Sequence, residues 1–209
     1  MDENKICILD YGSGNVSSVY NLLLTIIQPN DKVLISNNPK DIISATHIIL
    51  PGVGAFGASM EKIKRKIDLE ILEREILEIK KPFLGICVGM QVLSDVGYEF
   101  GEHKGLGWIK GEVRKLEAGN LPLPHIGWNN IEAANNSPLL KGLNDNQDFY
   151  FVHSYVFKEK NIENVAARTE YGEKFNSVIA KDNIFGVQFH PEKSQKAGKL
   201  LLNNFFRLK

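Results

Sequence analysis

Two short segments of this sequence carry side chains that could perform nucleophilic chemistry together. The first is an apolar run ending in Gly85-Ile86-Cys87-Val88-Gly89, followed by a helical pattern. This is the arrangement of a nucleophile elbow, with a thiol in place of the more familiar serine. The second, Phe189-His190-Pro191-Glu192, supplies an imidazole and a carboxylate. A thiol needs a base and a group that orients the base, so the sequence predicts a catalytic triad of Cys87, His190 and Glu192.

Each triad member has its own expected role. Cys87 is reactive only as the thiolate, and the first turn of a helix favours that form because its unpaired backbone N–H groups attract negative charge. His190 would take the thiol proton and return it to the leaving group, while Glu192 would hold the imidazole tautomer. A free cysteine taken alone is usually a buried core residue. Glycine at positions 85 and 89, which suits a sharp turn and leaves room for substrate, favours the catalytic interpretation.

Acyl transfer also requires hydrogen-bond donors for an oxyanion. The backbone N–H of Val88, directly after the nucleophile, is the expected first donor. A second is expected from Leu50-Pro51-Gly52-Val53-Gly54-Ala55-Phe56, a glycine-containing loop at the end of the third strand. Pro-Gly-x-Gly alone indicates only a turn, so this prediction depends on the loop and Cys87 sharing one edge of a sheet.

The elements that must position these residues alternate in the first half of the chain. Apolar runs predict strands at 5–10, 32–36, 47–50 and 83–86, with a tight turn at 11–15, and apolar residues at helical spacing predict helices at 16–26, 57–79 and 88–96. Short strands separated by helices favour βαβ units and a parallel sheet covered on both faces.

The second half of the chain has a different pattern. Strands are expected at 108–116, 126–132, 149–157, 165–169, 177–181 and 184–189, with a closing helix at 196–207. A mixed sheet with an antiparallel hairpin near 180–184 follows. No repeat or linker interrupts the sequence, so residues 1–209 are expected to form a single domain.

Composition narrows the class of protein. The 209 residues include 25 basic and 25 acidic side chains, so no global field favours nucleic acid or an anionic membrane. The basic cluster at 62–66 alternates with isoleucine and is interpreted as a solvated helix face. No apolar run has membrane-spanning length, and no signal sequence is evident at the start. The chain has two cysteines, too few for a disulfide framework, which indicates a reducing, cytoplasmic location. Cys7 lies in an apolar run and is explained as a small buried hydrophobic residue.

The two motifs together resemble the class I, or triad-type, glutamine amidotransferases. Other segments narrow the resemblance to the HisH family, the glutaminase subunits of imidazole glycerol phosphate synthase: Asp10-Tyr11-Gly12-Ser13-Gly14-Asn15, Pro51-Gly52-Val53-Gly54-Ala55-Phe56, Pro124-His125-Ile126-Gly127-Trp128-Asn129, Phe151-Val152-His153-Ser154-Tyr155 and the run from Gly186 to Ser194. The resemblance covers essentially the whole chain in order. Sister amidotransferases usually carry Pro-Gly-Gly in the oxyanion strand and lack the His-Ile-Gly-Trp-Asn segment.

The resemblance implies a fold, a reaction and further site residues. The fold is α/β, a flavodoxin-like three-layer arrangement with a central mixed, mostly parallel sheet flanked by helices. The reaction is hydrolysis of L-glutamine to glutamate through a cysteinyl thioester, without a cofactor or metal. The resemblance places Gln91 at the α-amino acid end of the substrate, with contacts from His153, Ser154 and Tyr155. It also implies that the Gly52–Val53 peptide reorients before its N–H serves the oxyanion hole, so that the isolated glutaminase is nearly silent.

The resemblance also implies a partner, a (β/α)8-barrel cyclase subunit (HisF-like) that receives ammonia through an internal tunnel. Tyr11, Asn15, Trp128 and Asn129 are expected at the interface of this heterodimer, although Trp128 could instead be a core aromatic. His125, in the same segment, has no assigned role.

Several alternatives stay open or are weak. The segments at Trp108 and at 115–117 do not match the expected family pattern, so a paralogue that supplies ammonia to another synthase, for example in sugar-nucleotide modification, remains an alternative, as does a stand-alone cysteine hydrolase. A non-catalytic binding module is disfavoured by the intact triad. Gly12-Ser13-Gly14 suggests a dinucleotide site but lacks the third glycine and the ribose-binding acid. A metal site is disfavoured because no histidine pair has the usual helical spacing.

Overall fold

A nine-stranded mixed sheet forms the centre of the molecule. The computed structural model describes residues 3–12, 15–144 and 147–209. Five neighbouring strands of the sheet pair in parallel, in the order β2-β1-β3-β4-β13: Lys32–Ser36, Lys5–Leu9, His47–Gly52, Phe83–Cys87 and Ile184–Val187. The order of its first four strands, with β1 between β2 and β3, is that of a flavodoxin-like doubly wound fold. The flavodoxin-like prediction is therefore confirmed.

The rest of this sheet is antiparallel. It continues through β12 (Glu173–Lys181), β11 (Val165–Tyr171), β8 (His125–Ala133) and β9 (Gln147–His153). The predicted hairpin is present, with Lys181 paired to Ile184. The antiparallel share of the mixed sheet is larger than expected, because parallel pairing stops at β13.

A smaller sheet lies beside the antiparallel half. It has the order β10-β7-β5-β6, formed by Tyr155–Glu159, Gly111–Lys115, Val96–Gly97 and His103–Lys104. The strand expected at 149–157 is thus two strands. Ser154 separates them, and its carbonyl accepts a hydrogen bond from the N–H of Leu116, beside β7. The chain therefore changes sheets at Ser154, which periodicity could not indicate.

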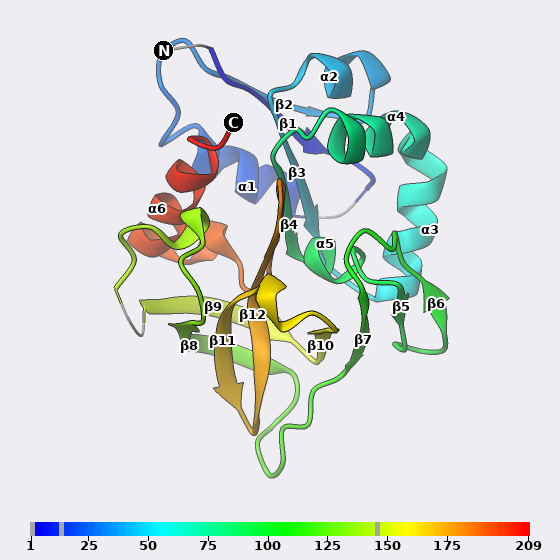
Figure 1. Cartoon of the computed structure of the whole chain (residues 1–209), viewed down its shortest axis with the longest axis vertical. Coiled ribbons are helices and arrows are strands. Elements are labelled where there is room, and N and C mark those ends of the chain that lie inside the picture. Colours follow the sequence, from blue (N-terminus) through cyan, green and yellow to red (C-terminus); the bar gives the residue numbers. More distant parts are fainter. Residues whose placement is uncertain (1–2, 13–14, 145–146) are drawn as a thin grey trace.

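Helices cover both faces of the parallel strands (Figure 1). α1 (Val16–Leu23) and α6 (Gln195–Phe205) lie on one side, and α3 (Phe56–Lys66), α4 (Leu69–Glu73) and α5 (Val88–Gln91) lie on the other. The short α2 (Pro39–Ser44) packs near α4, and one-turn 3-10 helices occupy Pro138–Leu140, Ile162–Asn164 and Pro191–Lys193. Every residue of β3, β4 and β13 is buried, as expected for strands covered on two faces.

Two predicted helices are shorter in the structure. The helix expected at 57–79 breaks at Ile67, whose backbone is extended, and Asp68 starts α4 by accepting a hydrogen bond from the N–H of Ile71. A π-helical turn, Arg74–Glu78, follows. The apolar period continues across the break because Met60 and Ile63 before it and Leu72 and Ile76 after it are buried, so the pattern alone indicated one helix.

The helix expected at 88–96 ends at Gln91. The carbonyl groups of the next four residues accept hydrogen bonds from the N–H groups of residues 105–109, a loop that is distant in the sequence. Those carbonyls therefore cannot extend the α-helical ladder.

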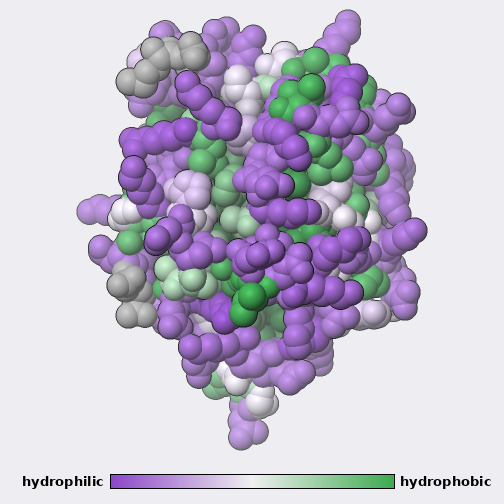
Figure 2. All heavy atoms as spheres, viewed as in Figure 1, coloured by the Kyte–Doolittle hydropathy of each residue, from purple (hydrophilic) through white to green (hydrophobic). Residues whose placement is uncertain are grey.

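The face of the molecule seen in Figure 1 carries both hydrophilic and hydrophobic residues. Figure 2 shows hydrophilic residues over most of that face, with hydrophobic residues in smaller groups between them. In the described part of the chain, no helix combines the length and the apolar character that crossing a bilayer requires.

Candidate active site

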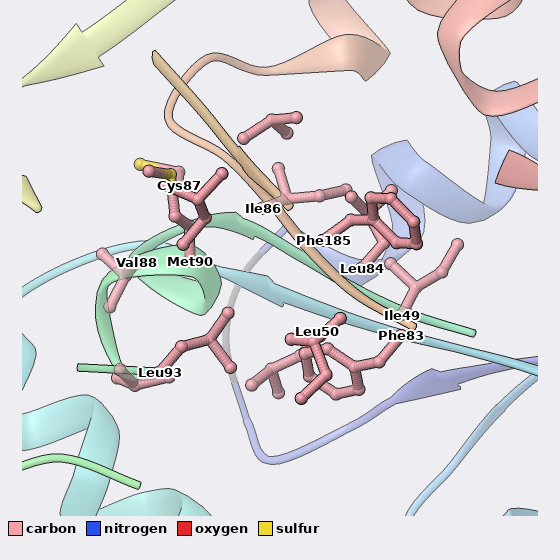
Figure 3. Packing of buried hydrophobic residues seen from close by; sticks show 14 of the residues in the cluster. Ile49, Leu50, Phe83, Leu84, Ile86, Cys87, Val88, Met90, Leu93 and Phe185 are labelled. Atoms are coloured by element: carbon pink, nitrogen blue, oxygen red, sulfur yellow. The ribbon is translucent and has the colours of Figure 1, made fainter. Parts of the chain in front are cut away.

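Cys87 occupies the sharp turn between β4 and α5. Its backbone φ is 54°, a left-handed value that is strained for a residue with a side chain. The sulfur lies at one end of the buried cluster, away from Ile49 and Phe83 (Figure 3). This is the geometry of a nucleophile elbow, which lifts the reactive atom out of the sheet.

The glycines flanking Cys87 have a packing role that the sequence did not indicate. A Cβ on Gly89 would lie 1.8 Å from the carbonyl oxygen of Leu50, and one on Gly85 would lie 2.4 Å from the carbonyl oxygen of Gly89. Glycine at these positions therefore lets α5 lie directly on β3 and β4. The expectation that they leave room for substrate is not needed to explain them.

The surroundings of the Cys87 sulfur are polar on two sides. The side-chain amide of Gln188 donates to Sγ at 3.7 Å, and the thiol is 3.9 Å from the carbonyl oxygen of Val152. Because α5 has only four residues, its dipole is weaker than that of the predicted helix. The Gln188 amide therefore adds a hydrogen-bond donor at the sulfur to those of the short helix.

His190 and Glu192 form a buried pair, each side chain 1% exposed. His190 Nδ1 lies 2.7 Å from Glu192 Oε1, and the amide nitrogen of Asn15 donates to the same oxygen at 2.6 Å. His190 Nε2 and Glu192 Oε2 have no hydrogen-bond partner among the described residues. The pair is therefore held on its Nδ1 side, and Nε2 is not engaged by another hydrogen bond among the described residues.

Ionisation of this pair follows from its contacts. Burial lowers the pKa of His190, but interactions with Cys87 and Glu192 together outweigh burial and raise that pKa from 6.5 to about 10. Burial raises the pKa of Glu192, and the hydrogen bond and charge of His190, with the Asn15 amide, reverse this and lower it. A carboxylate facing an imidazolium is thus the favoured state near neutral pH.

Cys87 and His190 line a small cavity of about 90 Å³ at the carboxyl ends of β4 and β13. All four predicted substrate contacts line the same cavity: Gln91, His153, Ser154 and Tyr155. Two of the three oxyanion candidates, Val53 and Val88, line it as well. Glu192 lies behind His190, where an orienting group belongs. The structure thus brings the predicted triad and the predicted substrate contacts to one place.

Gly52 is the last residue of β3 and pairs with Cys87. A Cβ at this position would lie 2.7 Å from both the backbone nitrogen of Gly89 and the hydroxyl oxygen of Tyr11. Close packing therefore explains glycine at position 52, whether or not its peptide reorients.

Three residues at this site were missed by the sequence analysis. Glu99 supplies a carboxylate to the cavity wall and accepts from the N–H of Phe56 at 2.8 Å, while Gln188 and Asn15 contact the triad. Gln188 lies two positions before His190, so the strand period could have placed it beside Cys87. Glu99 lies in the turn between β5 and β6 and had no local signal.

The expected interface residues separate into two groups. Tyr11 and Asn15 are buried, 1% and 7% exposed, so their assignment to a partner surface is wrong for their side chains. Asn15 turns inward because Glu192 offers a buried acceptor. Trp128 is 50% exposed, which excludes the core alternative, whereas the amide of Asn129 points inward to His125 and to the carbonyl of Glu170.

The other candidates from the sequence are the glycine-containing turn, a metal site and Cys7. Ser13 and Gly14 lie outside the described residues, so the structure does not address the Gly12-Ser13-Gly14 turn. Within the described ranges, no group of three His, Cys, Asp or Glu side chains is placed to hold a metal ion. Cys7 is buried, and burial raises the pKa of its thiol to about 12, which fits an inert core residue.

Comparison with known proteins identifies the family of this chain. Residues 7–208 match the family model for "Glutamine amidotransferase class-I". The chain is 47% identical over 204 residues to imidazole glycerol phosphate synthase subunit HisH 1 of Campylobacter jejuni (strain 81-176), covering 97% of this chain and 100% of that protein. It is 45% identical over 203 residues to HisH of Aquifex aeolicus, covering 97% and 96%.

Solved structures show the same fold at low identity. A structure of PurLQS from Thermotoga maritima matches with a TM-score of 0.75 and 18% identity, covering 98% of each chain. A glutamine amidotransferase from the same organism matches with a TM-score of 0.65 and 17% identity, covering 98% of this chain and 83% of that one. By family match and by relatives, this chain belongs to the class-I glutamine amidotransferases and, within them, to the HisH family of imidazole glycerol phosphate synthase subunits.

Proposed function

We propose that this protein is the glutaminase subunit of an imidazole glycerol phosphate synthase in histidine biosynthesis. It hydrolyses L-glutamine to glutamate through a thioester on Cys87 and passes the ammonia to a cyclase subunit. The observation that carries this proposal is the meeting of a strained cysteine and a buried, paired histidine at one cavity. Membership in the HisH family supports the pathway.

The reaction follows from the contacts of Cys87 and His190. The Cys87 thiolate attacks the side-chain amide carbon of glutamine, and His190 donates a proton to the departing nitrogen, which leaves as ammonia. Water then loses a proton to His190 and attacks the thioester, which releases glutamate and restores the thiolate. The Glu192 carboxylate stabilises the imidazolium in both steps. The N–H groups of Val88 and of the Gly52–Val53 peptide are the proposed oxyanion donors.

The cavity also has groups for the α-amino acid end of glutamine. Glu99 is its only acidic lining residue in the described part of the chain, so its carboxylate is the proposed partner of the substrate ammonium. Gln91 uses its side-chain amide N–H groups on the carbonyl of Tyr155 and on Gln188, at 2.9 and 3.1 Å. We therefore expect the side-chain amide oxygen of Gln91 to accept a hydrogen bond from the substrate.

The proposed partner is a (β/α)8-barrel cyclase subunit. Trp128 and Ile126, 50% and 59% exposed, project from β8, and Ile126 pairs with Val152, which lines the cavity. An exposed apolar surface beside an active site suits a partner that must receive ammonia without loss to water. Such a subunit is expected to work in the cytoplasm.

A glutaminase assay with matched cysteine variants tests the proposal. Glutamate release from L-glutamine is measured for the protein with and without the candidate cyclase and its nucleotide substrate. Cys87→Ala should abolish release while leaving the fold and partner binding nearly intact, whereas Cys7→Ala, at the other buried cysteine, should keep the activity. Release that persists in Cys87→Ala refutes the nucleophile. Activity only with a different synthase, or full activity alone, would favour a paralogous amidotransferase or a stand-alone hydrolase.

A further inference from the structure

Two buried histidines, of which His153 lines the cavity, have no step in the reaction described above. His125 lies on β8 and His153 lies directly across from it on β9, and they are 3% and 6% exposed. His125 Nδ1 is 3.1 Å from His153 Nε2. Burying two imidazoles in contact is costly unless their hydrogen bonds are satisfied, so this pair requires an explanation.

The neighbours of the pair determine which ring nitrogens carry hydrogen. His153 Nδ1 lies 3.0 Å from the carbonyl oxygen of Tyr155, which only accepts, so Nδ1 must donate. In a neutral ring, Nε2 of His153 is then an acceptor, and Nδ1 of His125 must donate to it. Nε2 of His125 in turn accepts from the amide of Asn129, at 3.3 Å.

The amide of Asn129 fits this direction at the outer end of the chain. Its nitrogen also donates to the carbonyl of Glu170 at 3.0 Å, so one hydrogen serves His125 and the other serves Glu170. Its oxygen accepts from the N–H of Asn130 at 2.9 Å, which fixes the amide against a flip. Every hydrogen bond from Asn129 to Tyr155 therefore points the same way.

The other end of the chain reaches the wall of the glutamine cavity. The Tyr155 carbonyl that accepts from His153 also accepts from the amide of Gln91, and Gln91 bonds to Gln188, whose amide donates to the Cys87 sulfur. Moving this carbonyl would move Gln91. The hydrogen-bond chain thus joins β8 to the proposed substrate contacts.

The packing around the pair favours neutral rings. His125 stacks on Tyr171 and Phe151, with ring centroids 4.0 and 5.0 Å apart, and His153 contacts the edge of Phe175. Burial lowers the pKa of His125 to about 4. Burial first, and then the charges of His125 and His190, lower the pKa of His153 to about 3. A second proton on His153 would place an N–H on Nε2, facing the N–H of His125 Nδ1. A second proton on His125 would place an N–H on Nε2, facing the amide N–H of Asn129.

We propose that Asn129, His125 and His153 form a neutral, one-directional hydrogen-bond chain that fixes the Tyr155 carbonyl, and through it Gln91, for glutamine binding. His125 and Asn129 are positioning residues, since neither lines the cavity. Their effect on glutamine rests on the proposed function, whereas the protonation pattern of the chain does not. Both rings must carry hydrogen on Nδ1, although free histidine mostly carries it on Nε2.

Nitrogen NMR of the ¹⁵N-histidine-labelled protein tests the protonation pattern without any activity. At pH 7, His125 and His153 should each show a protonated Nδ1 and an unprotonated Nε2, assigned through His125→Asn and His153→Asn. A charged ring, or an Nε2–H tautomer at either position, overturns the proposal. This result is independent of whether the protein hydrolyses glutamine.

Steady-state kinetics of the complex with the cyclase test the positioning role. His125→Phe keeps the ring stacking but removes both hydrogen bonds, and it should raise the KM for glutamine about 10-fold, with kcat changed much less. His125→Asn can still donate to His153 and should recover most of the loss. His47→Phe, at an equally buried histidine far from the cavity, is the control for stability and should leave KM unchanged. An unchanged KM in His125→Phe, or equal losses in the Phe and Asn variants, would overturn the role. Absence of glutaminase activity in the parent complex would instead refute the proposed function.

Discussion

Replacing Glu192 by glutamine should cost this enzyme less than loss of a triad carboxylate usually does, because Asn15 holds the new amide in the correct orientation. The amide nitrogen of Asn15 and Nδ1 of His190 both lie against Glu192 Oε1, at 2.6 and 2.7 Å. Two donors at one position select the amide oxygen of a glutamine there. The amide nitrogen then takes the place of Oε2, which is buried and has no hydrogen-bond partner among the described residues.

The expected loss is therefore that of charge alone. A hydrogen bond to a charged group contributes about 1.5–3 kcal/mol and a neutral one about 0.5–1.5 kcal/mol, so the difference is on the order of 1–1.5 kcal/mol. That difference predicts a fall in kcat of about 5- to 15-fold for Glu192→Gln. It also predicts that the pKa of His190 falls by about one unit.

The pH profile gives the sign of this effect. The raised pKa of His190 keeps the imidazolium up to a pH of about 10, so the parent rate should fall as pH rises through that value, where the acid for ammonia departure is lost. Glu192 contributes to raising that pKa, so in Glu192→Gln the alkaline fall should begin at lower pH. The same raised pKa stabilises the fold below pH 6.5, and this contribution is lost as pH rises through about 10.

A double-mutant cycle isolates the part played by Asn15. In Asn15→Ala alone, either carboxylate oxygen can still accept from His190, so the tautomer is kept. In the double variant the glutamine amide is free to turn its nitrogen toward His190, and kcat should fall toward the roughly 10⁴-fold loss seen when a triad tautomer is wrong. The combined loss should exceed the product of the single losses by about 10-fold or more.

The assay is glutamate release from saturating glutamine by the complex with the cyclase, measured between pH 6 and 11. Glu61→Gln, at an exposed position on α3, is the charge-matched control and should match the parent. Strictly multiplicative losses, or an alkaline limb that stays in place in Glu192→Gln, would show that Asn15 does not orient residue 192.

Three further predictions concern other parts of the molecule. Glu99→Gln keeps an acceptor for the N–H of Phe56 but loses the charge, so the KM for glutamine should rise about 10-fold with little change in the Tm; an unchanged KM would argue against an ammonium at Glu99. Trp128→Ala should weaken cyclase binding by about 2 kcal/mol in calorimetry, as an exposed aromatic anchor would, while the fold is retained, and unchanged affinity would place the interface elsewhere. Gly89→Ala sets a Cβ 1.8 Å from the Leu50 carbonyl oxygen and should destabilise the protein by about 3 kcal/mol or more in urea unfolding; a loss below about 1 kcal/mol would mean that α5 shifts freely.

Local signals were sufficient for much of the fold. The strands around Cys7, Ile49 and Leu84 were predicted within a residue or two, because a strand buried on both faces must be a continuous apolar run. Element ends that depend on distant partners were not predictable. The loop at 105–109 ends α5 early, and β7 diverts the chain at Ser154.

The sequence by itself determined the reactive groups: a cysteine between glycines after a buried strand, and a histidine and a glutamate joined by proline. Each of these two motifs is a short run of consecutive residues, so it can be recognised in the sequence without any knowledge of the fold. Only the tertiary structure decided that Asn15 holds Glu192, that Gln188 faces the Cys87 sulfur, and that His125 and His153 share a hydrogen bond. Hydrogen bonds between residues far apart in the chain leave no periodic trace, because their direction is set by donors and acceptors that meet only when the sheet has formed.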